Sequence, residues 1–149
     1  TIVYGGFAQD EGFVETNLGR SKTDRKKMAV YPASEPHTKY AYTGWQVLER
    51  YGNFTYIACK LKTGRTHQIR VHALSQGFPL VGDDKYGDFA FNRECTHGLL
   101  GAPLKRMFLH AWKLRFAHPV TGEPVDITAP LPEELSAVIS ALESKKAAQ

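Results

Sequence analysis

The sequence has few of the features that mark secreted, membrane or repeat proteins. Its 149 residues include two cysteines, Cys59 and Cys95, whose separation fits neither a metal site nor a disulfide framework. No apolar run approaches the roughly 20 residues that cross a bilayer. There is no internal repeat and no low-complexity segment. These absences favour a reducing compartment, and we expect a cytoplasmic protein.

The composition instead fits one folded domain, 1–149, with a basic surface. Hydrophobic residues make up 42% of the chain, which is enough for a core and too many for a disordered segment. Lysine and arginine outnumber aspartate and glutamate by 19 to 15, so the formal net charge is +4. This charge favours a polyanionic partner, although many basic proteins bind nothing acidic.

Hydrophobic periodicity predicts a mixed α+β fold. Residues 54–61 alternate between two faces and follow a Gly-Asn turn, which predicts an antiparallel hairpin with the strand over 45–51. Residues 107–116 and 124–128 read as a second hairpin, and 9–15 as a loop that enters a short extended piece. A C-terminal helix begins at Pro130 and Pro132. We expect a bent, mixed, mainly antiparallel sheet with a central helix and a C-terminal helix packed against it.

The stretch from Leu61 to His72 reads as the end of a strand, a tight turn and the first turns of the central helix. Gly64 supplies a permissive backbone for the turn, and the Thr66 hydroxyl is expected to cap the helix. Gly77 is expected to close it. The residues expected to face the core are Ile69, Ala73 and Leu74.

Cations crowd the beginning of this helix, where backbone N–H groups already carry a partial positive charge. Arg65 and Arg70 lie there with His67 and His72, at a cost of roughly 0.3–1 kcal/mol for each exposed charge. This pattern predicts an anion at the helix start, either a phosphate or a carboxylate. The alternative is that both arginines are solvated or paired within the protein.

A basic run lies between residues 20 and 30. It predicts a loop that contacts the phosphates of an RNA strand, and the alternative is a flexible, solvated loop. The cations of this run are Arg20, Lys22, Arg25, Lys26 and Lys27.

The adjacent acids Asp83 and Asp84 could suggest a metal site. Neighbouring residues on extended backbone point to opposite faces, however, and Asp beside Gly is common in turns. His67 and His72 are five residues apart, which is not the spacing of a helical pair of metal ligands. We therefore expect no metal, although a metal-dependent nuclease or hydrolase built on these four residues is a competing hypothesis.

Several motifs together resemble the RluA-type pseudouridine synthases. The resemblance covers nearly the whole chain in order, and its central motif is long enough to be specific. The matching segments are Leu18–Arg20, Lys27–Val30, Thr63–His72, Gly77–Gly87, Phe108–Leu114 and His118–Glu123.

The resemblance implies isomerisation of uridine to pseudouridine in RNA, in large-subunit (23S) ribosomal RNA rather than transfer RNA, without a cofactor. The family uses one aspartate in a segment like His-Arg-Leu-Asp, and we find no such segment in this chain. By resemblance, Arg70 is the partner of that absent aspartate. The chain is then the C-terminal portion of a catalytic domain and is expected to be inactive alone. Its sheet would expose an edge or an apolar face, which favours self-association.

The remaining site residues follow from the same match. Leu109 is expected to form an apolar floor under the extruded base, or else to belong to the strand core. A non-catalytic RNA-binding module is the alternative function. The groups expected to orient or contact RNA are Arg65, His67, Gln68 and His72, together with the cations of the basic run.

Overall fold

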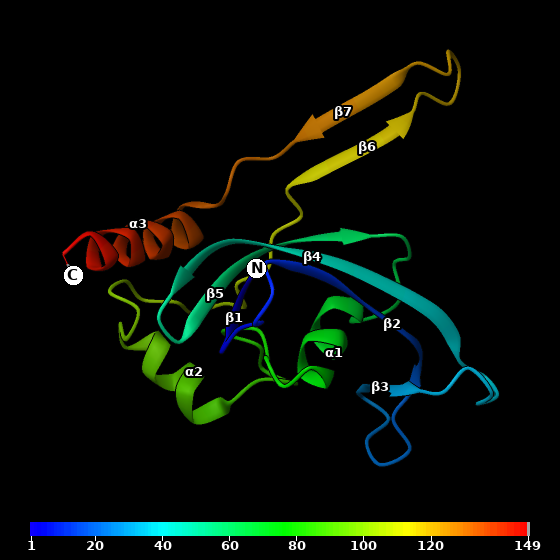
Figure 1. The fold of residues 1–149 in the computed structure, drawn as a ribbon, viewed down its shortest axis with the longest axis horizontal. Coiled ribbons are helices and arrows are strands. Elements are labelled where there is room, and N and C mark those ends of the chain that lie inside the picture. The colour runs from blue at the N-terminus through cyan, green and yellow to red at the C-terminus, as the bar shows by residue number, and fades with distance from the viewer. Residues whose placement is uncertain (149) are drawn as a thin grey trace.

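The computed structural model describes residues 1–148 and is built on one curved antiparallel sheet (Figure 1). The order of its five strands is β1-β5-β4-β2-β3. Figure 1 shows β2 and β4 arching over α1, so the concave face of the sheet holds the helix. The strands are β1 (Ile2–Tyr4), β2 (Glu11–Arg20), β3 (Met28–Tyr31), β4 (Lys39–Tyr51) and β5 (Phe54–Leu61).

Three helices and a separate hairpin complete the described part of the chain. The helices are α1 (Gln68–Ser75), α2 (Phe89–Thr96) and α3 (Glu133–Ala147). The strands β6 (Lys113–Ala117) and β7 (Pro124–Thr128) pair only with each other and project away from the body (Figure 1). Within residues 1–148, no helix has the length and apolar character needed to cross a membrane.

The period-two pattern explains how the sheet buries one face. Along β4, Ala41, Thr43 and Trp45 point inward, and from β5 Ile57 joins them. The indole of Trp45 stacks on the ring of Phe7, with ring centroids 3.8 Å apart. On the C-terminal side, Leu135, Val138 and Leu142 of α3 enter a second cluster of buried residues. The predicted α+β class, with a bent sheet, a central helix and a C-terminal helix, is confirmed.

Two strands have bounds that differ from the predicted ones. Residues 9–15 were expected to be mainly a loop, but β2 runs without a break from Glu11 to Arg20 because β4 pairs with it as far as Leu18. The strand expected over 107–116 is regular only from Lys113. Phe108 instead enters the core, where it is 1% exposed, and its N–H bonds the Val81 carbonyl.

Candidate functional site

The start of α1 is formed by an unusual backbone conformation at His67. His67 is the N-cap residue, has φ 55°, and makes no side-chain capping bond. The predicted Thr66 cap is therefore wrong, and Gly64 is not among the glycines with positive φ. At the other end the prediction is confirmed, because Gly77 with φ 84° lets the Phe78 N–H reach the Ala73 carbonyl.

The apolar face of α1 differs by one position from the prediction. Ala73 is buried and Ile69 packs against the sheet core, as expected, but Leu74 is 44% exposed. Val71 and His72 point inward instead. The buried face of α1 therefore includes two polar residues, Gln68 and His72, that periodicity alone did not select.

Arg70 lies in the first turn of α1 and is held by a buried carboxylate. Its Nε donates to Asp83 Oδ2 at 2.9 Å and its Nη2 donates to Asp83 Oδ1 at 2.8 Å. The Arg70 side chain is 12% exposed and that of Asp83 is fully buried. A bidentate pair of this kind fixes the plane of the guanidinium as well as its charge.

The turn that carries Asp83 holds this carboxylate in place. Asp83 Oδ1 also accepts the backbone N–H groups of Lys85 and Tyr86, at 2.9 and 3.0 Å. Gly82, with φ 81°, is needed at the entrance to the turn, because a Cβ there would lie 2.4 Å from the Arg106 carbonyl oxygen. Burial raises the pKa of Asp83, but the Arg70 bonds and the two N–H groups outweigh it, so the pKa is lowered overall.

The lowered pKa predicts a loss of stability in acid. Asp83 contributes stability that is complete above its unfolded pKa, about 3.9, and that falls as pH drops toward its lower folded pKa. Urea unfolding of the wild type should therefore weaken between about pH 5 and pH 3. The Asp83→Asn variant should show a smaller change over that range. Equal pH dependence in the two proteins would contradict the assignment.

One edge of the Arg70 guanidinium is left open by this arrangement. Asp83 occupies the edge formed by Nε and Nη2, while Nη1 makes no hydrogen bond within residues 1–148. Asp84 approaches Nη2 at 3.3 Å with a side chain that is 88% exposed. Arg70 thus has two N–H donors on Nη1 free for a further anion.

Gln68 and His72, both expected to contact RNA, lie in the interior. Gln68 is 3% exposed; its amide donates to the Tyr42 carbonyl and to Thr43 Oγ1, and its oxygen accepts from Thr63 Oγ1 and the Arg65 N–H. Contact with RNA would require these bonds to break. Gln68 therefore joins α1 to β4 and to the turn before it.

His72 makes a similar connection one helical turn later. It is 1% exposed, its Nδ1 lies 2.7 Å from Thr43 Oγ1, and its Nε2 lies 2.8 Å from Thr16 Oγ1. The two threonines belong to neighbouring strands, so one imidazole fixes α1 against both β2 and β4. Burial lowers the pKa of His72, which favours the neutral form that these hydroxyls accommodate.

His67 and Arg65 are more accessible. His67 Nδ1 lies 2.7 Å from the hydroxyl of Tyr86, and its ring meets the Tyr86 ring edge to face. Arg65 donates from Nε to the Tyr40 carbonyl at 2.9 Å, so its partner is on β4, whereas Arg70 bonds Asp83. The structure therefore separates the two arginines that the sequence placed together.

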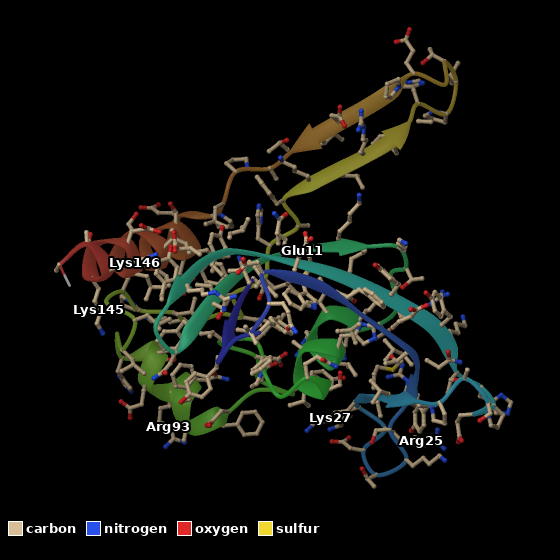
Figure 2. The ribbon with its side chains drawn as sticks, viewed as in Figure 1. Glu11, Arg25, Lys27, Arg93, Lys145 and Lys146 are labelled. Carbon is tan, nitrogen blue, oxygen red and sulfur yellow. The ribbon has the colours of Figure 1, made fainter. Side chains whose placement is uncertain are left out.

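Residues 20–27, from the last residue of β2 to the residue before β3, are here called the basic loop. Its cations are exposed except for Lys27, which is half-buried, and Lys22 pairs with Glu35 at 2.6 Å. The Lys27 ammonium lies 6.0 Å from the centre of the Tyr86 ring, and Figure 2 shows Lys27 on the side of the loop nearer α1 than Arg25. A hollow of about 490 Å³ lies between the basic loop and residues 35–38. Its lining includes Arg20, Lys22, Arg25, Tyr31 and Glu35.

Leu109 lies beside the core of the sheet. It is partly buried against the cluster that contains Trp45 and Ile57, and its carbonyl accepts Arg106 Nη2 at 3.0 Å. No group of three His, Cys, Asp or Glu side chains in the described part of the chain is placed to hold a metal ion. Cys59 and Cys95 are both free thiols.

Sequence reasoning missed two residues that organise the site. Asp83 was interpreted as an ordinary residue of a turn, and Tyr86 only as part of the matching segment Gly77–Gly87. The signal for Asp83 was present, because a helix start rich in cations requires an anion and Asp83 follows an apolar segment that returns to the core. No comparable signal pointed to Tyr86, since its partners are brought to it only by the fold.

Comparison with known proteins gives a consistent result. A family model described as RNA pseudouridylate synthase matches residues 2–75. An uncharacterized RNA pseudouridine synthase of Chlorobaculum parvum is 41% identical over 145 residues, covering 93% of this chain and 44% of that protein. A ribosomal large subunit pseudouridine synthase D of Neisseria meningitidis is also 41% identical over 145 residues, covering 94% of this chain and 37% of that protein.

Solved structures show the same relationship. The chain superposes on human RNA Pseudouridylate Synthase Domain Containing 1 with a TM-score of 0.69 at 26% identity, covering 96% of this chain and 63% of that one. The curved sheet, the motif at the start of α1 and these similarities define an RNA-modifying enzyme family. The chain belongs to the RNA pseudouridylate synthases, and it spans about two fifths of the length of the curated relatives that it matches.

Proposed function

We propose that this chain forms part of an enzyme that isomerises uridine to pseudouridine in large-subunit ribosomal RNA. In that reaction the bond from ribose C1′ to uracil N1 breaks, the base turns, and a new bond joins C1′ to C5. The proton on C5 is released and N1 takes up a proton, so the reaction is balanced without an oxidant or a cofactor. Family membership supports the reaction type, and the name of the Neisseria relative supports the ribosomal substrate.

The observation that carries the proposal is the orientation of Arg70. Its guanidinium is fixed by Asp83 on one edge, while Nη1 has no partner in the described chain. An aspartate that met this open edge would be kept ionised and held in one geometry, as a carboxylate acting on a sugar or a base requires. We propose that this aspartate lies in a longer protein, outside residues 1–149.

The domain assignment and the location follow from the same proposal. Residues 1–149 would be the C-terminal portion of a catalytic domain, which fits the 37–44% of the relatives' lengths that the chain covers. The polypeptide alone would lack the nucleophile and would be inactive. A protein that modifies ribosomal RNA would work in the cytoplasm, consistent with two unpaired cysteines.

We assign RNA contact to the accessible cations. The basic loop presents Arg20, Lys22, Arg25, Lys26 and Lys27, and such groups bind phosphates in a salt-dependent manner. Arg65 and His67 complete this group on the side of α1. Gln68 and His72 are assigned instead to positioning α1 on the sheet, because their hydrogen bonds are satisfied internally.

Tritium release tests the proposal. RNA labelled with tritium at C5 of uridine is incubated with the longer protein or with residues 1–149 alone, using ribosomal and transfer RNA in parallel. We expect release from ribosomal RNA by the longer protein and none by residues 1–149. Binding without release by both proteins would favour the RNA-binding module, and turnover by residues 1–149 would show that the nucleophile is within this chain.

A further inference from the structure

The hydroxyl of Tyr86 joins three parts of the site that are distant in sequence. Tyr86 is 5% exposed and follows the turn that holds Asp83. Its oxygen accepts the backbone N–H of Met28 at 2.8 Å, at the start of β3 where the basic loop ends. The same oxygen lies 2.7 Å from His67 Nδ1, immediately before α1.

The two contacts at this hydroxyl favour one tautomer of His67. The Met28 N–H is a donor, so one lone pair of the Tyr86 oxygen is occupied. The hydroxyl has one proton of its own, and a nitrogen 2.7 Å away is well placed to accept it. In that arrangement Nδ1 of His67 is unprotonated, and the neutral imidazole carries its proton on Nε2.

The surroundings of His67 are cationic. Arg20, Arg70 and Lys85 all act on its titration, opposed by Asp83. Burial is the largest cause of a lowered pKa at His67, and Arg70 and Lys85 lower it further. Lys27 lies against the ring of Tyr86 as well. The Nε2 N–H makes no hydrogen bond within the described residues, so it is available to a ligand.

We infer that Tyr86 is a positioning residue, whose hydroxyl ties the end of the basic loop to α1 and fixes His67 as a neutral Nε2–H donor for an RNA phosphate. The choice of an RNA phosphate as the ligand rests on the proposed function. The linkage through Tyr86 rests on the geometry alone. A phosphate suits the site because Arg20, Lys27 and Lys85 supply positive charge around a directional donor. His67 also has the left-handed backbone conformation, with φ 55°, at the position where it meets Tyr86.

Nuclear magnetic resonance tests the linkage without any assay of activity. Long-range proton–nitrogen spectra of residues 1–149 should show His67 as the Nε2–H tautomer. In Tyr86→Phe the bond that favours the neutral form is removed, so the His67 pKa should rise and both tautomers should appear. Exchange of the Met28 amide proton should accelerate roughly fivefold, the effect of losing one hydrogen bond.

Tyr56→Phe is the matched control, because the Tyr56 hydroxyl has no hydrogen-bond partner among residues 1–148 and its ring packs on Phe108. It should leave both the His67 signals and Met28 exchange unchanged. A His67 that carries its proton on Nδ1 in the wild type would overturn the inference. So would a Tyr86→Phe variant whose His67 titrates as in the wild type.

Binding measurements on the longer protein test the role in RNA recognition. Tyr86→Phe and His67→Ala should each weaken RNA binding roughly fivefold, and the double variant should be no weaker than His67→Ala alone. Additive losses would contradict action through His67. Failure of the wild-type protein to bind RNA would refute the proposed function and the phosphate role together, whereas the tautomer result judges the linkage by itself.

Discussion

Replacing Asp83 with alanine is expected to lower the free energy of unfolding by about 3–5 kcal/mol, the usual result of breaking a buried ion pair from one side. The change would leave the Arg70 guanidinium, with a side chain only 12% exposed, without its bidentate partner. It would also leave the N–H groups of Lys85 and Tyr86 without an acceptor. Urea unfolding followed by circular dichroism measures the difference.

The adjacent residue provides a control for this measurement. Asp84 is also an aspartate beside Arg70, but its side chain is 88% exposed and it makes one contact, at 3.3 Å. Asp84→Ala should change the free energy of unfolding by no more than about 0.5 kcal/mol, as exposed substitutions usually do. Similar losses in the two variants would mean that net charge in the turn matters, rather than the buried pair.

Replacing Arg70 with lysine in the longer protein is expected to reduce the rate of pseudouridine formation by about 100-fold, the scale of losing one positioned donor at a reaction centre. Lysine keeps the positive charge and can still neutralise Asp83. It cannot hold Asp83 with one edge while it offers a second edge to another carboxylate. RNA affinity should stay within about twofold of the wild type, since Arg70 is not counted among the phosphate contacts.

Arg25→Gln is the variant with which the RNA affinity of Arg70→Lys is compared. Arg25 is exposed on the basic loop, and its side chain forms no ion pair within residues 1–148. Its loss should weaken RNA binding and reduce the slope of log affinity against log salt by about one. If Arg70→Lys reproduced this change in salt slope, Arg70 would be a phosphate contact rather than the partner of an aspartate.

The parts of the fold that local pattern determines were predictable. The alternation over 54–61 predicted both ends of β5, and Gly77 ends α1 as expected. Residues 11–15 were misinterpreted because their exposed face carries Glu11 and Glu15, and only pairing with β4 makes them a strand. The C-terminal helix expected to begin at Pro130 and Pro132 is present as α3, but it starts at Glu133, and it buries Leu135, Val138 and Leu142.

The sequence predicted that an anion lies at the start of α1, but it did not predict which residue supplies that anion. Cations at the start of α1 implied an anion, and the structure supplies Asp83 from 13 residues further along the chain. No local rule assigns that pairing, because it depends on how the segment after α1 returns past Gly82. The left-handed residue before α1 is also His67 rather than a glycine, and no local pattern in the sequence predicts a positive φ at that position.

The most direct test of the central claim is the single-turnover release of tritium from C5-labelled uridine in large-subunit ribosomal RNA, with the longer protein at saturating concentration. Saturation removes differences in binding, so the rate reports the reacting centre. We expect release by the wild type and about 100-fold slower release by Arg70→Lys. Equal rates for the two proteins would contradict the claim that Arg70, oriented by Asp83, completes the catalytic site.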